Sequence, residues 1–235
     1  DNTAVGNNSL DTNTEGADNV AVGKNALDDN TTGGSLTAVG RSALANNTTA
    51  RNNTAVGASA LLTNTTGADN VAVGQGALQA NTTAANNTAV GRDSMASNTT
   101  GTSNTAVGQN SLDSATTADN NTAVGKDALE DNSTGSANTA VGKGAADNVT
   151  TGSDNTAIGY LALGAVTTGS QNTTIGDEAG SNLASGASNN TCLGFQARTG
   201  ATNSSHAIVI GSNITAASSN NRFSFGTASN IVHNN

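Results

Sequence analysis

A strict 17-residue repeat limits what this chain can fold into more than any other feature of its sequence. The tripeptide Ala-Val-Gly, or a close variant, recurs at this spacing, and then at steps of 18, 17 and 15 residues. The tripeptides end at Gly6, Gly23, Gly40, Gly57, Gly74, Gly91, Gly108, Gly125, Gly142, Gly159 and Gly176, and after these at Gly194, Gly211 and Gly226. So regular a period indicates one structural unit per repeat, stacked on its neighbours.

Each unit is expected to be β-structure. The consensus N-T-A-V-G-x-x-A-L-x-x-N-T-T-G-x-x is too short for a pair of helices, and its Thr-Ala-Val segment favours a strand. Asn, Thr and Gly then recur at fixed offsets, as they do in turns. We therefore predict an all-β fold, a parallel β-solenoid or β-roll of 17-residue repeats, with about thirteen coils. Each coil is expected to hold two short strands, at Thr-Ala-Val and at Ala-Leu; a helical Ala-Leu piece is the alternative.

Composition supports a thin, regular core. The 235 residues weigh only 22.8 kDa, and the 34% hydrophobic residues are mostly Ala and Val. The net charge is −9, and the eight Lys and Arg are scattered singly, which argues against binding nucleic acid or an anionic membrane. No apolar run approaches the roughly 20 residues of a membrane-spanning helix, so no membrane insertion is expected. Asp1 opens in the middle of the pattern, and we expect a longer parent protein.

The small residues in the strands suggest an oligomer. Ala precedes Val in all ten repeats from Ala4 to Ala157, and Ala or Ser precedes Leu from Ser9 to Ala162. Since side chains alternate along a strand, each strand should have a larger apolar face and a tiny one. Both faces look shielded from water, and a tiny face allows another backbone layer to come close. We therefore predict an elongated homotrimer in which the Ala face meets a neighbouring chain.

Equal positions of stacked repeats should form ladders about 4.8 Å apart. Asn side chains can bond both their own turn and the next coil. One structural ladder is expected at Asn19, Asn53, Asn70, Asn87, Asn104 and Asn121, and a second at Asn13, Asn30, Asn47, Asn64, Asn81 and Asn98, resumed at Asn132. Thr pairs such as Thr31-Thr32 add hydroxyls. They favour strands and satisfy turns, or, in the alternative interpretation, they form an ice-binding face.

The residues needed for chemistry are scarce, so no enzyme is expected. The only histidines are His206 and His233, and no Cys or His spacing fits a metal site. The glycine-aspartate repeat of calcium-binding rolls is missing. Cys192 stands where most repeats have Ala, which predicts a small buried thiol. We expect no catalytic residue, no metal and no cofactor.

The last quarter differs from the rest. Its candidate binding residues are Arg222 and the four aromatic residues of the chain, Tyr160, Phe195, Phe223 and Phe225. We divide the chain into a regular shaft at 1–176, degenerate repeats at 177–215, and a C-terminal cap or a transition to a missing domain at 216–235. Solenoid ends need caps, so these aromatic residues either form the cap or contact a receptor at the tip.

The Ala-Val/Ile-Gly anchor resembles the head repeats of trimeric autotransporter (YadA-like) adhesins, and Asn-Thr-Ala-Val-Gly-x-x-Ala-Leu looks still more like repeats of bacteriophage tail fibres. The segment 225–235 is similar to those that precede an endosialidase-type intramolecular chaperone in such fibres. The resemblance implies a trimeric fibre shaft, on a virion or a cell surface, that presents a binding end to a host glycan or protein receptor. The alternatives are an ice-binding solenoid and a self-assembling extracellular filament; an enzyme acting on glycans ranks last.

Overall fold

A computed structural model of the chain describes residues 1–200, 202–216, 220–227 and 229–233. It is an all-β parallel solenoid of about 13 turns with repeats of roughly 17 residues, as the period predicts, and the described residues contain no helix. Accordingly, none of them belongs to a helix long and apolar enough to cross a membrane. The chain divides into two compact units, Asp1–Asn120 and Asn121–Asn235.

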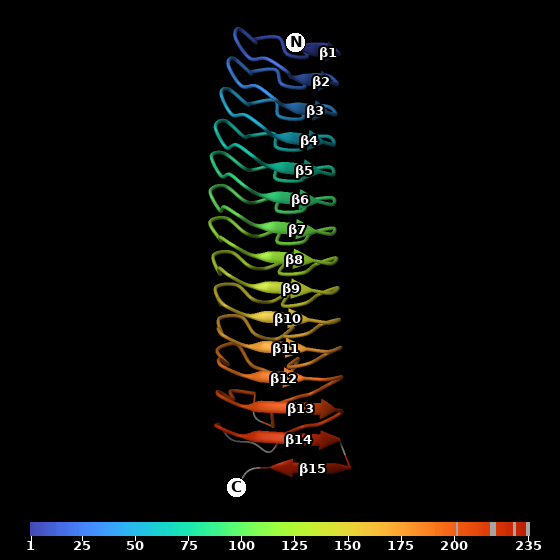
Figure 1. The fold of residues 1–235 in the computed structure, drawn as a ribbon, viewed down its shortest axis with the longest axis vertical. Helices are drawn as coiled ribbons and strands as arrows, with labels where there is room; N and C mark the ends of the chain where they lie inside the picture. The colour runs from blue at the N-terminus through green and yellow to red at the C-terminus, as the bar shows by residue number, and fades with distance from the viewer. Residues whose placement is uncertain (201, 217–219, 228, 234–235) are drawn as a thin grey trace. The chain divides into compact units, whose positions relative to one another are not determined.

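The first unit stacks seven strands of three residues each, one per turn (Figure 1). They are β1 (Thr3–Val5), β2 (Val20–Val22), β3 (Thr37–Val39), β4 (Thr54–Val56), β5 (Val71–Val73), β6 (Thr88–Val90) and β7 (Thr105–Val107). Each strand pairs with the next in parallel, and equal positions of the repeat face each other, as Ala38 faces Ala55. A backbone repeat of 17 residues therefore becomes a set of straight side-chain columns within the unit.

The second unit continues this pattern and then changes it. It holds β8 (Thr122–Val124), β9 (Thr139–Val141), β10 (Thr156–Ile158), β11 (Thr173–Ile175), β12 (Thr191–Leu193), β13 (Ile208–Ser212), β14 (Phe223–Thr227) and β15 (Asn230–His233). The extra residue of the 18-residue step and the two missing residues of the 15-residue step are accommodated in the turns. The strand register is unchanged, because Thr174 still faces Cys192 and Ile210 still faces Phe225. β15 pairs with β14 in the antiparallel direction, so the parallel stacking ends there. Of the predicted cap at 216–235, residues 217–219, 228 and 234–235 lie outside the described part.

The Ala-Leu segment does not form a second strand, which corrects the sequence prediction. Asn25 and Leu27 have φ angles of 57° and 53°, and the residues after Gly23 form consecutive turns. A left-handed residue ends an extended strand, and for a side chain such as Leu it costs about 1–2 kcal/mol. The Leu27 side chain is fully buried. Core packing of this residue thus offsets its backbone strain, a balance that apolar periodicity does not reveal.

The Ala residues of the strands point into the solenoid, so the prediction that they meet a neighbouring chain is wrong. Ala21, Ala38 and Ala55 are fully buried within the single chain, together with Leu27 and Leu44 from the turns. The interior between the strand and the turn is narrow, and Ala is what fits beside Leu and the ladder asparagines. The alternate residues of each strand consequently face outward.

A glycine closes each strand because its backbone is both left-handed and crowded. Gly57 has φ +138°, and a Cβ added there would lie 2.4 Å from the carbonyl oxygen of Gly74 in the next turn. A larger residue would strain the backbone and separate the two turns. The recurring Gly that first revealed the period therefore sets how closely the turns stack.

Candidate functional site

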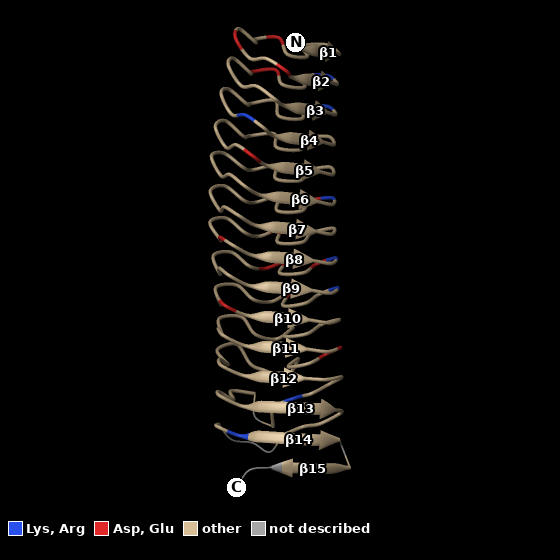
Figure 2. Ribbon diagram, in the orientation of Figure 1, with Lys and Arg blue, Asp and Glu red and all other residues tan. Residues whose placement is uncertain are grey.

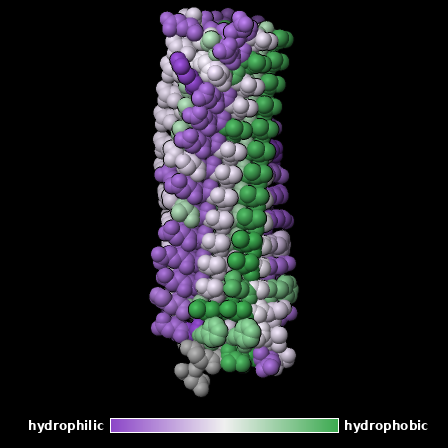
Figure 3. Space-filling view, in the orientation of Figure 1, coloured by the Kyte–Doolittle hydropathy of each residue, from purple (hydrophilic) through white to green (hydrophobic). Residues whose placement is uncertain are grey.

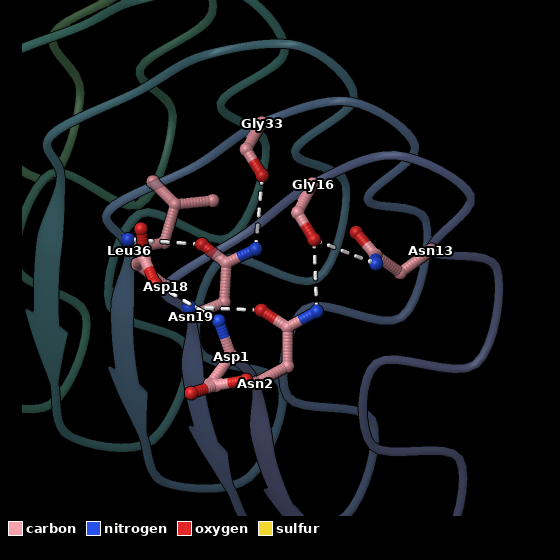
Figure 4. A network of polar contacts seen from close by, with 8 residues as sticks. All are labelled: Asp1, Asn2, Asn13, Gly16, Asp18, Asn19, Gly33 and Leu36. Carbon is pink, nitrogen blue, oxygen red and sulfur yellow. Dashed lines mark hydrogen bonds and ion pairs between the residues drawn. The ribbon is translucent and has the colours of Figure 1, made fainter.

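Each residue of the predicted asparagine ladder closes its own turn and bonds to the next, as Figure 4 shows for Asn2 and Asn19. The Asn19 side-chain amide donates to the Gly33 carbonyl at 2.9 Å, 14 residues along the same turn. Its Oδ1 accepts the backbone N–H of Leu36 at 3.0 Å, while the Asn19 N–H itself donates to Asn2 Oδ1 at 3.0 Å. The residues predicted for this ladder are all buried and all donate to the carbonyl 14 residues later: Asn19, Asn53, Asn70, Asn87 and Asn104 in the first unit, and Asn121 in the second.

The second ladder bonds amide to amide. Asn47 Nδ2 donates to Asn30 Oδ1 at 2.8 Å, and Asn64 Nδ2 donates to Asn47 Oδ1 at 3.1 Å. The column continues through Asn81 and Asn98 and stops where Ala115 takes the next position. Asn98 Oδ1 is buried there without a hydrogen-bond partner. A continuous ladder satisfies its own buried polar groups, and its ends do not.

The threonine pairs lie in bends between the strands. Thr31 Oγ1 donates to the Thr48 backbone carbonyl at 2.9 Å, and Thr48 Oγ1 donates to that of Thr65 at 3.1 Å. The second residue of a pair, such as Thr66, is exposed. The first hydroxyl of each such pair therefore satisfies the backbone of the next turn, as a turn residue does.

The most distinctive surface of each unit is the outward side of its parallel strands, which we call the valine face: the first and third residue of β1–β7 in the first unit and of β8–β14 in the second. These positions carry Thr, Val, Ile, Leu and Phe and no charged residue. In the first unit Val5, Val56 and Val107 are 58%, 36% and 37% exposed, and in the second Ile158 and Ile175 are 37% and 41% exposed. In Figure 3 the apolar column follows the strands in each unit. A continuous exposed apolar surface of this kind marks an interaction site.

Charges lie at the two ends of the strands, beside the valine face (Figure 2). The residue directly after the strand glycine is basic and exposed in five turns, which hold five of the eight Lys and Arg: Lys24, Arg41, Arg92, Lys126 and Lys143. We call these residues the basic flank: Lys24, Arg41 and Arg92 in the first unit, and Lys126 and Lys143 in the second. Two residues before a strand, Asp18, Asp69 and Asp154 are exposed and form the acidic flank. Arg92 pairs with Asp93 and Lys126 with Asp127, so part of the basic charge is balanced locally.

The five candidate tip residues lie in the second unit but not in one cluster. Tyr160 and Phe195, each 44% exposed, follow the strand glycines and continue the column of the basic flank. Lys143 Nζ lies 5.9 Å from the Tyr160 ring centroid, within cation–π range. Phe223 and Phe225, 42% and 54% exposed, belong instead to the valine face on β14. Arg222, directly before β14, is half-buried.

Reactive groups are few in the described part of the chain. No three His, Cys, Asp or Glu side chains in it gather into a metal-binding group. Burial raises the pKa of the Cys192 thiol to about 12, so this thiol stays protonated at neutral pH and is a poor nucleophile. A hollow of about 320 Å³ is lined by polar residues that include Glu15, Asp18 and Arg51. The alternation of Thr-Ala-Val predicted a larger apolar face on each strand, but it did not predict that this face is the exposed one.

The fold and these surfaces define a class, the parallel β-solenoid repeat proteins, here with an outward strand face free of charge. Compared with models of protein families, with curated proteins and with solved structures, the chain matches none.

Proposed function

We propose that this chain is a structural and adhesive fibre segment, of the kind found in phage tail fibres or surface adhesins, that presents a receptor-binding end to a host surface. The observation that supports it best is the way identical turns are bonded to each other. Within each unit every turn is tied to the next by strand pairing, and most turns are also joined by buried asparagine bonds, as between Asn53 and Asn70. Such stacking makes a stiff spacer without the large core that an enzyme domain builds around its cleft.

The fibre is proposed to be a homotrimer on a virion or at a cell surface. The support is the bare valine face, since an apolar column with residues such as Val56 and Val107 at 36% and 37% exposure gains from being covered. Closed cyclic assembly covers the same patch on every copy. The Ala residues no longer contribute to this argument, because they are buried inside one chain.

The receptor is proposed to be a host surface glycan or protein, bound near the aromatic residues of the second unit. Tyr160 and Phe195 offer exposed rings, and Lys143 lies beside the Tyr160 ring. Exposed aromatic rings with a polar or cationic neighbour suit the apolar faces and hydroxyls of sugars. A second aromatic surface lies at β14, where Phe223 and Phe225 are exposed and Arg222 directly precedes the strand.

Two measurements test this proposal. Light scattering at several concentrations should give a constant mass of about three chains of 22.8 kDa each. Immobilised bacterial surface polysaccharides should bind the protein, and a Tyr160→Ala, Phe195→Ala double variant should bind at least tenfold more weakly. Gln75→Ala, at the equivalent position in the first unit, serves as the control and should bind normally. Open-ended growth in mass would instead indicate a filament, and absence of binding to every polysaccharide would count against a glycan receptor.

A second candidate, an ice-binding solenoid, is favoured by a different observation. Thr37 and Thr54, and after Val71 also Thr88 and Thr105, stand on successive strands of the outward face, each half-exposed and beside an outward Val. A regular array of hydroxyls and methyl groups can order water. Inhibition of ice recrystallisation by the wild-type chain, lost in a Thr54→Lys, Thr88→Lys variant, would support this function over the fibre.

A further inference from the structure

We propose that the valine face is the surface through which copies of this chain associate, and that the charges at its two edges make them associate with the same polarity. This inference rests on the homo-oligomeric fibre proposed above and names its interface. The occupant of the face is therefore a second copy of the chain, whose own valine face carries the same apolar columns.

The valine face is apolar and uncharged, which favours association between copies. In the first unit its fourteen positions, two on each of seven strands, carry only Thr and Val. Val22, Val39, Val73 and Val90 are half-buried, and Val5 is 58% exposed, so apolar surface faces solvent at every turn. The face carries no charged side chain that would discourage association, and a contiguous exposed apolar patch of this kind marks a protein–protein contact. Apolar columns of equal spacing can pack against each other along their whole length.

The two edges of the valine face carry opposite charge. The carboxyl ends of the strands carry the basic flank, with Lys24 and Arg41, and the amino ends carry the acidic flank, with Asp18 and Asp69. Lys24 and Asp18 lie at the two ends of the same strand, β2. In the second unit Lys143 follows β9 and Asp154 precedes β10, one strand spacing or about 4.8 Å away along the stack. This separation has exceptions: Arg51 and Arg222 lie on the amino side of β4 and β14, and Asp177 lies at the carboxyl end of β11, directly after Gly176.

These edges distinguish the two ways in which two valine faces can meet. A rotation about an axis parallel to the stack keeps the polarity and brings the basic flank of one copy beside the acidic flank of the next. A rotation about an axis parallel to the strands reverses the polarity and brings basic beside basic and acidic beside acidic. Opposite charges across the edge favour the first arrangement, and like charges disfavour the second. The same geometry holds for two copies and for three.

The first experiment removes the apolar contact. Val56→Asp places a charge at the middle of the face in the first unit, and Thr66→Asp places one at an exposed bend of the same unit. Light scattering should show that Val56→Asp raises the dissociation constant of the oligomer at least a hundredfold, whereas Thr66→Asp leaves it unchanged. Circular dichroism of both variants should retain the wild-type spectrum. A Val56→Asp protein that keeps the wild-type mass would overturn the assignment of the face.

The second experiment tests polarity. Lys24→Glu with Arg41→Glu should weaken association at low salt, and adding Asp18→Lys with Asp69→Lys should restore it, because every copy then carries both reversed flanks. Cysteines introduced together as Lys24→Cys and Asp18→Cys, on the two flanks of β2, should form interchain disulfides on mild oxidation only if copies associate with the same polarity and at the same height. Absence of both the charge rescue and the interchain disulfide would contradict association with the same polarity.

These results also separate failure of this inference from failure of the fibre proposal. If the Val56→Asp protein still forms the wild-type oligomer, the homotrimeric fibre proposal stands, and the valine face is not its interface. A wild-type chain that stays monomeric at every concentration refutes both, and leaves the bare face to the ice-binding candidate.

Discussion

Each buried asparagine makes contacts that no other small side chain can replace, because it carries a donor and an acceptor on one planar group. Asn64 donates to Asn47 Oδ1 at 3.1 Å and to the Gly67 carbonyl at 3.0 Å, and accepts from Asn81 Nδ2 at 2.8 Å. Asp would lack the donor and Leu would lack both. The ladder is thus specified by residue chemistry rather than by volume.

Asn64→Ala should destabilise the protein by roughly 2–4 kcal/mol, because Asn47 Oδ1 loses its donor and Asn81 Nδ2 loses one acceptor inside the core. Urea unfolding followed by circular dichroism measures the change. The control is Asn46→Ala, at an exposed neighbouring position outside the ladder, which should change stability by less than about 0.5 kcal/mol. Equal effects of the two substitutions would refute the role of the ladder.

At Ala115 the second asparagine ladder lacks an Asn, so a substitution there should stabilise the protein. Ala115→Asn restores a donor opposite the unpartnered Asn98 Oδ1 and should stabilise the protein by about 1 kcal/mol. The comparison is Ala115→Val, which adds volume at the same buried position without a donor and should destabilise. If both substitutions destabilise equally, space rather than the missing hydrogen bond limits this turn.

A glycine at the end of a strand permits less change than its small size suggests. Gly159 has φ +134°, and a Cβ there would lie 2.3 Å from the Gly176 carbonyl oxygen. Gly159→Ala should therefore cost about 3 kcal/mol or more, as strain and separation of the turns add together. Gly186→Ala in the same unit, where the nearest atom lies 3.9 Å away, should be nearly neutral in thermal denaturation. Similar melting temperatures for both variants would contradict this account.

At the scale of one turn, acidic residues between the strands reduce stability at neutral pH. Burial, and then the negative charge of Asp93, raise the pKa of Asp113 above its ordinary value of 3.8. A hydrogen bond with the Ala96 backbone and the charge of Arg92 lower this pKa only in part. The folded state therefore binds the Asp113 proton more tightly than the unfolded state does. The stabilisation from this more tightly bound proton is fully present at pH values below the pKa of Asp113 in the unfolded state. It is lost as the pH rises through the pKa of Asp113 in the folded state.

Asp113→Asn should consequently melt at a higher temperature than the wild-type protein at pH 7, and the difference should vanish near pH 3. The amide keeps the shape and an acceptor oxygen but does not ionise. Thermal unfolding between pH 3 and pH 7 measures both curves. A variant that is less stable at pH 7 would show that the carboxylate makes a favourable contact that outweighs its burial.

The strand β12 contains the single cysteine of the chain. Cys192 faces inward between Thr174 and Val209 and is fully buried, as the sequence predicted. A thiol reagent should not react with it in the folded protein and should react completely in guanidinium chloride. Thr66→Cys supplies an exposed reference thiol that should react within seconds. Rapid reaction of Cys192 under native conditions would mean that β12 opens readily from the stack.

The sequence allowed the period, the Thr-Ala-Val strand and both asparagine ladders to be predicted, because each of these is repeated chemistry at a fixed offset. It did not reveal which side of the strand faces inward. Ala21 and Val22 alternate, and the larger Val would be the conventional core residue. The buried Leu27 reverses this choice, because it enters the interior from a left-handed turn and leaves room only for Ala. Backbone conformation, which an apolar pattern does not encode, therefore decided where the valine face lies.

At the scale of the whole molecule, successive turns of each unit place the same residues at the same positions. The turns are therefore interchangeable, and the fold does not fix how many there are. Asn53, Asn70 and Asn87 occupy equal positions and bond in sequence. Removal of one complete repeat would join Asp69 to Asn87 and recreate the same neighbours. In a stack with nearest-neighbour contacts, such a change removes one turn and its interfaces without disturbing the others.

Deletion of residues 70–86, which is 17 residues, should therefore give a folded protein with the same type of circular dichroism spectrum and a single cooperative melt at a modestly lower temperature. Deletion of residues 75–79 is the control. It removes only five residues but leaves a step of 12 residues from Gly74 to Gly91, three fewer than the shortest step in the chain, so this turn cannot close and the later columns lose their register. We expect this variant to lose stability far beyond that of the complete deletion, with a broad transition and a smaller urea dependence. If both deletions melt alike, the turns are held by general apolar packing, and the 17-residue register does not specify the fold.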